Sequence, residues 1–204
     1  MKAASRKALD ELRRLSKDKG GMIRTTEAIR QGVHPRTLYQ LRESGTLERL
    51  SRGVYRFSER KPLSDPDLVT VSIRVPKGII CLVSALAFHG ITTQIPHSIS
   101  LALEKGAESP RIDYPPVTVY RFSRTSLAAG IEEHEIDGVK VRVYSAEKTI
   151  ADCFKFRNKI GMDIVLEALK LYRTRKKFSL QRLLEYARIC RVEKVMSPYL
   201  EALA

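Results

Sequence analysis

Residues 35–44 hold polar side chains of the types that proteins use to recognise double-stranded DNA. Arginine can pair with guanine through two hydrogen bonds, glutamine can do the same with adenine, and threonine and tyrosine can bind phosphate groups. The apolar residues Leu38 and Leu41 are expected to face inward, together with Ile29 and Val33. The outward-facing candidates for DNA contacts are Arg36, Thr37, Tyr39, Gln40 and Arg42. The alternative is an amphipathic surface helix whose polar residues face only solvent.

Three helices joined by short turns are expected to position these side chains. Apolar residues recur at helical spacing in residues 1–19, and a pair of glycines ends that segment. A second helix is expected over residues 27–31, capped by Thr25 or Thr26, and Gly32 ends it because glycine adopts left-handed backbone conformations readily. Pro35 suits the first turn of a third helix, where a missing N–H costs little. Two short helices around a glycine-containing turn indicate a helix-turn-helix.

A basic β-hairpin is expected directly after the third helix. Residues 47–57 read as two short strands with a turn at residues 51–53. The order of helix, helix, turn, helix and hairpin predicts a winged helix-turn-helix DNA-binding domain over residues 1–58. The candidates in the hairpin for contacts to the DNA backbone or minor groove are Arg49, Arg52 and Arg56. The alternative use of such a domain is protein–protein interaction.

The net charge favours a polyanionic partner. The chain has 204 residues with 37 Lys+Arg against 23 Asp+Glu, a formal net charge of +14. Residues 1–62 hold 16 of the basic and 7 of the acidic residues, so the excess is concentrated near the N-terminus. Basic modules gain affinity for nucleic acid by releasing counterions from the phosphates, whereas the alternative is a basic surface without a partner. A second basic stretch lies at residues 173–191. Three interpretations are open for it: solvated helix ends, an extension of the surface that contacts DNA, or a binding site for an acidic partner.

The location expected from the sequence is the cytoplasm, with no membrane association. The charged N-terminal residues give no secretory signal, and no run of about eighteen apolar residues suggests a membrane span. Cys81, Cys153 and Cys190 are odd in number and widely spaced. This spacing argues against a disulfide framework or a zinc site and favours buried, reduced thiols.

The remainder of the chain predicts a mixed α/β domain over residues 67–204, after a polar linker at residues 59–66, so the expected fold class is α+β. Residues 67–75 alternate like a strand, but Asp65 and Pro66 are typical of a helix start, and we favour a helix. Ser84 is expected to cap a short helix. Strands are expected at residues 99–103, 117–122, 131–136 and 139–144, with a two-residue turn at Asp137-Gly138, and further helices after Ser145 and Ser179.

No arrangement of residues indicates catalysis, a metal site or a cofactor. The four histidines are far apart and lack metal-ligand spacing. Ser84 and His89 suggest a nucleophile and a base, but Ser84 lacks the flanking glycines of a serine elbow. Asp137 and Lys140 faintly resemble the acid–lysine pairs of metal-dependent nucleases, yet the turn with Gly138 explains Asp137 better. Three charged residues are expected to form surface ion pairs on one helix: Glu147, Lys148 and Asp152.

Several stretches together form the pattern of a known family. The N-terminal ones are residues 32–39, 45–47 and 52–56, which many small winged helices share. The C-terminal ones are more particular: residues 75–78, 84–90, 144–154 and 198–201. With these stretches the chain resembles, over nearly its whole length, the AbiEi antitoxins of bacterial type IV toxin–antitoxin systems.

The resemblance implies a transcriptional regulator with two roles. The winged helix would bind inverted repeats in the promoter of its own operon and repress it. The C-terminal domain would counter a co-encoded, nucleotidyltransferase-like toxin, AbiEii, without forming a stable complex with it. The family lends no catalytic residues and assigns toxin neutralisation to no particular position. A stand-alone winged-helix regulator and a metal-dependent nuclease are the alternatives.

Overall fold

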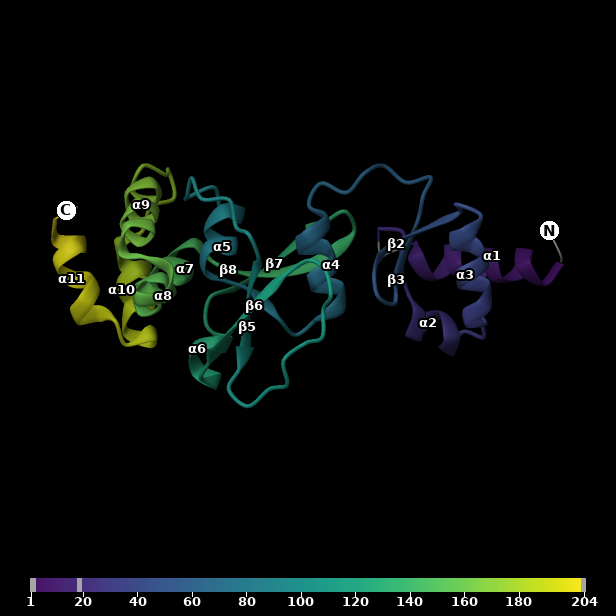
Figure 1. The fold of residues 1–204 in the computed structure, drawn as a ribbon. Helices are drawn as coiled ribbons and strands as arrows, with labels where there is room; N and C mark the ends of the chain where they lie inside the picture. The colour runs from purple at the N-terminus through teal and green to yellow at the C-terminus, as the bar shows by residue number, and fades with distance from the viewer. Residues whose placement is uncertain (1–2, 18–19, 203–204) are drawn as a thin grey trace. The chain divides into compact units, whose positions relative to one another are not determined.

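The computed structural model describes residues 3–17 and 20–202, and the fold is α+β (Figure 1). Contacts within the chain define two compact units. The first unit comprises Met1–Pro76, Pro110–Pro115 and Glu135–Val141, and the second comprises Lys77–Ser109, Pro116–His134 and Arg142–Ala204. Each unit is therefore assembled from stretches that lie far apart in the sequence.

The first unit begins with the three helices and the hairpin that the sequence predicts, together with a short strand, β1, that it does not predict. The expected cap of the second helix is wrong, because Thr25 and Thr26 lie inside the helix and its N-cap is Arg24. The first expected helix, residues 1–19, corresponds to α1 at Ala3–Ser16, and residues 1–2 and 18–19 of that expectation lie outside the described residues. The elements that follow are β1 (Met22–Arg24), α2 (Thr25–Arg30), α3 (Pro35–Glu43), β2 (Leu47–Ser51) and β3 (Val54–Phe57).

The three strands form an antiparallel sheet in the order β1-β3-β2, so β3 is its central strand. Tyr55 and Phe57 on one face of β3 pack into a core with the apolar side chains of α1, α2 and α3. Val33, Leu38 and Leu41 are buried there as expected. The side chain of Ile29, expected to face inward, is instead 47% exposed, because Ala28 occupies the buried position of α2 and each helical residue turns about 100° from the last.

The opposite face of this sheet is covered by α4 (Pro66–Arg74) and by the turn between β7 (Ile131–Ile136) and β8 (Val139–Tyr144). Met22 and Val54 pack there against Val69, Ile73 and Val139. The helix preferred for this segment is confirmed, since the Asp65 carboxylate accepts a hydrogen bond from the Leu68 N–H at 2.9 Å and so caps α4. Both faces of β3 are therefore buried.

The turn that packs on this unit is the predicted Asp137-Gly138 turn, in which both residues have positive φ, 51° and 77°. The Asp137 carboxylate accepts hydrogen bonds from the N–H and the hydroxyl of Ser64, both at 2.9 Å. Gly20 lies directly beside the turn, because a Cβ added to it would stand 1.6 Å from the Asp137 carbonyl oxygen. Only glycine fits this close approach.

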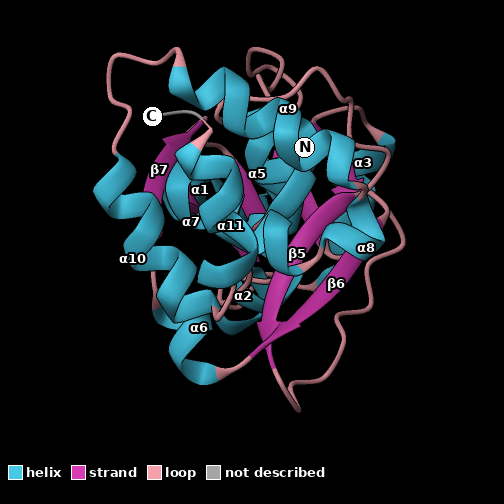
Figure 2. Ribbon diagram, turned by 90° about the vertical axis from the view of Figure 1, so that its left-hand side faces the viewer, coloured by secondary structure: helices cyan, strands magenta, loops and turns pink. Residues whose placement is uncertain are grey.

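The second unit is built on a mixed sheet in the order β6-β5-β4-β8-β7, whose β7–β8 turn belongs to the first unit. β5 and β6 run parallel and side by side (Figure 2), as do β4 and β8, whereas β4 and β5 are antiparallel. The strands are β4 (Ile79–Ile80), β5 (Ile99–Glu104), β6 (Val117–Phe122), β7 (Ile131–Ile136) and β8 (Val139–Tyr144).

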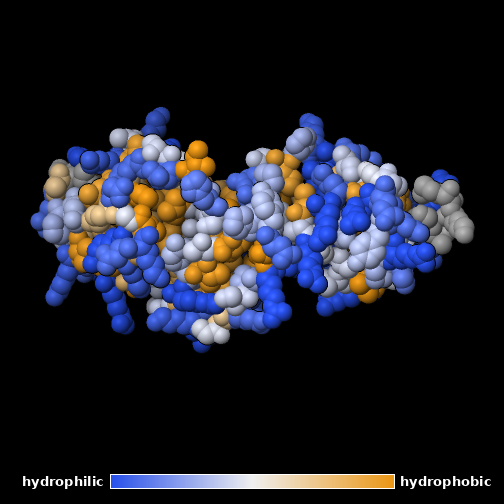
Figure 3. Space-filling view, in the orientation of Figure 1, coloured by the Kyte–Doolittle hydropathy of each residue, from blue (hydrophilic) through white to orange (hydrophobic). Residues whose placement is uncertain are grey.

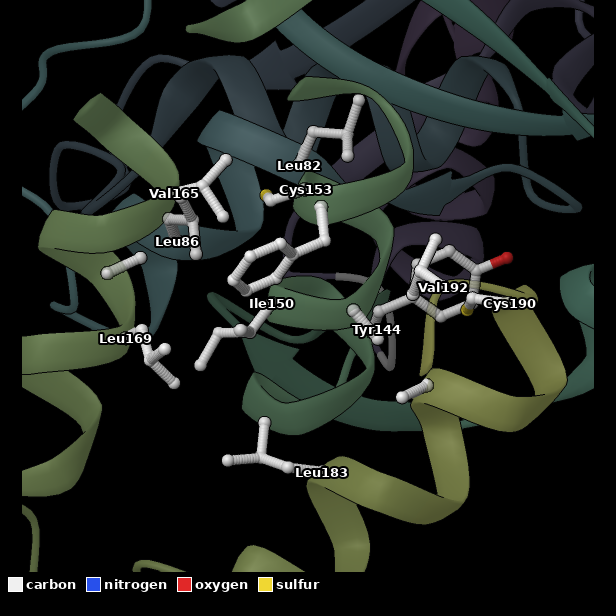
Figure 4. Packing of buried hydrophobic residues seen from close by; sticks show 14 of the residues in the cluster. Leu82, Leu86, Tyr144, Ile150, Cys153, Val165, Leu169, Leu183, Cys190 and Val192 are labelled. Carbon is white, nitrogen blue, oxygen red and sulfur yellow. The ribbon is translucent and has the colours of Figure 1, made fainter. Parts of the chain in front are cut away.

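The helices of this unit surround α7 (Ala146–Lys155), which packs against α5, α9, α10 and α11. Figure 4 shows Ile150 and Cys153 of α7 among buried side chains from these neighbours. Ser145 and Ser179 cap α7 and α10 as expected. The other helices are α5 (Leu82–Phe88), α6 (Arg124–Ala128), α8 (Arg157–Ile160), α9 (Met162–Arg173), α10 (Leu180–Cys190) and α11 (Glu193–Glu201). Within the described residues, none of the helices has the length and apolar character to cross a bilayer.

The prediction that Ser84 caps a helix is wrong. α5 begins two residues earlier, after Cys81, and Ser84 is buried inside it. Its hydroxyl accepts a hydrogen bond from the Ser100 N–H at 2.9 Å and donates one to the Ser98 carbonyl at 3.3 Å. Ser84 therefore fastens α5 to the start of β5, a role that no local signal could distinguish from capping.

Candidate nucleic-acid interface

α3 presents the side chains that the sequence singled out for DNA contacts. The helix begins at Pro35, and the ring nitrogen Nδ1 of His34 caps it by accepting a hydrogen bond from the Arg36 N–H at 3.1 Å. Leu38 and Leu41 anchor the inner face of α3 in the core of the first unit. The opposite face is exposed at Arg36, Tyr39, Gln40 and Arg42, and Thr37 is partly exposed.

The charged and polar groups on this face are available to a ligand. Within the described part of the chain, the side chains of Arg36 and Gln40 form no hydrogen bond or ion pair. The guanidinium of Arg42 lies 5.9 Å from the centre of the Tyr39 ring, whose side chain is half exposed. The surface over this part of the chain is largely hydrophilic (Figure 3).

The hairpin β2–β3 adds two exposed cations. Arg49 is exposed, and its guanidinium donates to the Ser51 carbonyl at 3.3 Å, which holds it along the strand. Arg52 is exposed at the turn, where Gly53 adopts a φ of 75°. α3 and β2 pack against each other through Leu38, Leu41 and Leu47. The recognition candidates of α3 and those of the hairpin therefore belong to one body.

The expectation that Arg56 is free to contact DNA needs correction. Arg56 is only 6% exposed, because it lies on the central strand β3. Its guanidinium donates to the Lys61 carbonyl and forms an ion pair with Glu48 at 3.3 Å. Arg56 thus ties the hairpin to the segment that follows it, and we no longer count it among the DNA contacts.

The part of the chain that carries these side chains matches a known family. Residues 10–58 match the AbiEi antitoxin family of transcriptional regulators. The resemblance found in the sequence is confirmed for this AbiEi segment, which extends from α1 to the residue after β3.

The fold of the chain is similar to that of a protein whose structure has been solved. The crystal structure of the RV2827C protein from Mycobacterium tuberculosis aligns with a TM-score of 0.51 and 15% sequence identity. The alignment covers 94% of this chain and 79% of that chain. At this identity the likeness concerns the fold alone. A search of curated proteins found no sequence match.

A residue outside the AbiEi segment supports its hairpin. The guanidinium of Arg74, in α4, donates to the Arg52 carbonyl at 2.5 Å and to the Arg111 carbonyl at 2.7 Å. These two bonds hold the hairpin turn against α4 and the loop at Pro110–Pro115. The role of Arg74 could not be predicted from the sequence, because both of its partners are backbone carbonyls, which every residue type has.

Glu147, Lys148 and Asp152 of α7 are not on the surface, which corrects another expectation. Lys148 and Asp152 are fully buried and form an ion pair at 2.5 Å. Lys148 also lies over the rings of Tyr144 and Phe122, and the thiol of Cys190 donates to Asp152 at 3.1 Å. Burial raises the pKa of the Asp152 carboxyl, and the neighbouring ammonium of Lys148 opposes that shift.

Glu147 is also buried, and it bonds to helices α9 and α10. Its carboxylate accepts a hydrogen bond from the Tyr172 hydroxyl at 2.8 Å and lies 3.5 Å from the guanidinium of Arg182. The pKa of Tyr172 is raised, first by burial and second by this bond. The side chains of Glu147, Lys148 and Asp152 thus all bind partners within the unit, and they hold its helices together.

The weaker catalytic candidates are likewise engaged elsewhere. His89 bonds through Nε2 to the Tyr144 carbonyl at 2.7 Å, and Ser84 bonds to backbone groups around β5. Asp137 binds Ser64, as described above. Among residues 3–17 and 20–202, no group of three or more His, Cys, Asp or Glu side chains could hold a metal ion.

Proposed function

We propose that residues 1–58 act as a winged helix-turn-helix that binds double-stranded DNA, and that the chain represses transcription of its own operon. The observation that carries the proposal is the unpartnered, exposed face of α3, with Arg36 and Gln40, beside a hairpin that exposes Arg49 and Arg52. α3 would enter the major groove, and the hairpin would contact the backbone. Bound protein would then block the polymerase.

Two copies of the chain would bind one operator. A single winged helix reads only a short stretch of sequence, and inverted repeats present that stretch twice. The arginines of the hairpin would supply the salt-dependent part of the affinity, because each phosphate contact releases counterions. The polar residues of α3 would supply the preference for sequence.

We further propose that residues 67–204 act as an antitoxin toward a co-encoded, nucleotidyltransferase-like toxin without a stable complex. Support comes from the match of the AbiEi segment to a family of antitoxin regulators. A stand-alone regulator is the alternative. Co-expression with the neighbouring gene separates the two, since only an antitoxin restores growth. Arg36→Ala should retain that rescue although it binds the operator more weakly.

The DNA-binding proposal is tested by fluorescence anisotropy of the full-length protein with its own upstream DNA and a shuffled duplex, over a range of salt. Arg36→Ala should weaken binding to the upstream DNA by about 1–3 kcal/mol and leave the shuffled duplex nearly unaffected. Arg52→Ala should weaken both duplexes and reduce the salt slope by about one unit.

Lys159→Ala is the matched control, because it removes one exposed positive charge from α8, which belongs to the second unit and not to the proposed face. Equal, weak binding of both duplexes by the unmodified protein would refute sequence-specific binding. Equal loss on both duplexes from Arg36→Ala would refute base recognition by that residue.

A further inference from the structure

A cavity of about 350 Å³ lies within the first unit, on the face of the AbiEi segment that packs against α4. Its walls come from β1, α2, α4 and the turn between β7 and β8. Ligand cavities in proteins begin at roughly 300 Å³, and a cavity of about 150 Å³ already accepts benzene. The space therefore suits a small molecule of one or two rings.

One wall of the cavity is apolar and fixed by the core. Met22, Ile73 and Val139 line it, and the same three residues belong to the cluster that joins the three-stranded sheet to α4. Pro76 adds a further apolar surface. A wall of this kind favours a ligand with an apolar body, because binding removes apolar surface from water.

The polar lining of the cavity favours an anion. Arg24 and Lys140 both line it, and neither side chain has a hydrogen bond or ion pair with any residue that the structure describes. Glu27 is the acidic residue of the lining, and it already has an interaction of its own. Two cations against one carboxylate leave a net charge of +1 for a ligand, and the Ser72 hydroxyl offers a neutral donor.

The cavity shares part of its wall with a hollow at the hairpin of the AbiEi segment. A second hollow of about 230 Å³ shares Arg24 and Ile73 with it and extends to Gly53 and Arg74 at the hairpin turn. Arg24 is paired with Val54 in the sheet and immediately precedes α2. A ligand that orders Arg24 would therefore act on both the helix-turn-helix and the hairpin.

We propose that this cavity binds a small amphipathic monoanion, a carboxylate or sulfonate on an apolar body, and that binding changes the affinity of the chain for DNA. The first half of this proposal, that the cavity binds such an anion, is independent of the function proposed above. The second half, that binding changes the affinity for DNA, rests on that function. The anionic group is held by Arg24 and Lys140, and the apolar body lies against Met22, Ile73 and Val139.

Isothermal titration calorimetry of the full-length protein tests the first half, with benzoate, 2-naphthoate and hexanesulfonate as probes. At least one probe should bind with one molecule per chain, and 2-naphthamide, which lacks the charge of 2-naphthoate, should bind at least tenfold more weakly than the naphthoate. Failure of all three probes to bind, or equal binding of the acid and the amide, overturns the proposal.

Three variants locate the site. Lys140→Gln and Arg24→Gln should each weaken the bound probe about tenfold or more, and both change solvent-facing ends of side chains rather than the core. Ser72→Trp should abolish binding by filling the cavity while keeping both charges. Arg30→Gln, an exposed cation of α2 outside the cavity, is the control and should bind the probe normally. Unchanged affinity in both Gln variants of the cavity overturns the proposal.

The same probe then tests the effect on DNA. It should shift the affinity for the upstream DNA in the unmodified protein and have no effect in Lys140→Gln. Probe binding without any shift in DNA affinity overturns the coupling and leaves the ligand site intact. Probe binding by a protein that binds no DNA refutes the proposed function alone.

Discussion

The buried ion pair of α7 leads to a prediction about stability. Replacing Lys148 by Met keeps an unbranched side chain over the rings of Tyr144 and Phe122 but removes the positive charge. The Asp152 carboxylate, which is fully buried, is then left with the Cys190 thiol as its hydrogen-bond donor among the side chains that the structure describes. An unpaired buried charge is strongly unfavourable.

The expected loss in the free energy of unfolding is about 3–5 kcal/mol, the usual cost of breaking a buried pair by removing one partner. This is a large share of the roughly 5–15 kcal/mol that stabilises a typical domain. The double variant Lys148→Met/Asp152→Leu should recover most of the loss and lie within about 2 kcal/mol of the unmodified protein, because apolar groups replace the pair. The two substitutions are thus expected to be strongly non-additive.

Urea unfolding followed by far-UV circular dichroism measures these free energies, since the chain has no tryptophan. Hydrogen exchange of peptides from Ala146–Lys155 assigns the loss to the second unit. A cost below about 1 kcal/mol for Lys148→Met would refute the reasoning, because it would mean that Asp152 is neutral in the core. A double variant as unstable as the sum of both single variants would refute it as well.

Three more predictions follow from particular contacts. Gly20→Ala should destabilise the first unit by more than the roughly 1 kcal/mol expected for Gly32→Ala, since both have positive φ but an added Cβ meets no atom within 4 Å at Gly32; equal urea midpoints would contradict the close packing at Gly20. The three cysteines should not react with a thiol reagent at neutral pH until the protein is unfolded, because all are buried and burial raises the pKa of Cys190 to about 12; rapid labelling of the native protein would contradict this. Hydrogen bonds from Thr93 and Thr92 lower the pKa of the Glu167 carboxyl, so Glu167 should stabilise the loop at Thr92 and Thr93 above the ordinary carboxyl pKa and lose this effect as the pH falls through the lowered value. Hydrogen exchange of the Thr93 amide, measured as a function of pH, should show this loss, and Glu167→Gln should abolish the pH dependence.

The sequence predicted those elements whose signals are local. For residues 66–74, the helix-start signal of Asp65 and Pro66 predicted the correct structure, whereas the alternating apolar residues that follow suggested a strand. The signal is local, because the capping residue and the proline both lie at the first turn of the helix. Asp137-Gly138 and the capping serines of α7 and α10 are equally local. The exposed face of α3 also followed from its own spacing.

The features that sequence reasoning missed depend on which elements cover one another. Arg56 lies on a strand that reads as half-exposed, but the strand is central and covered on both faces. Lys148 and Asp152 have the four-residue spacing of a surface ion pair, whereas α7 is surrounded by other helices. Ser84 differs from expectation for the same reason, because its partners are backbone groups of Ser98 and Ser100 on another segment of the chain. Ile29 differs because the sequence pattern assigned the wrong residue of α2 to the buried face.

The division of the first unit among three stretches of chain affects how the protein is synthesised. When residue 76 leaves the ribosome, the sheet of the AbiEi segment and α4 are present, but Ile136 and Val139, which pack beside them, have not yet been made. At roughly 5–20 residues per second, the apolar surface around Met22 and Val54 stays incompletely covered for several seconds. A nascent chain that stops in this interval would carry α3 on an unfinished unit, so the first unit is completed only after the stretches Lys77–Ser109 and Pro116–His134 of the second unit have also been translated.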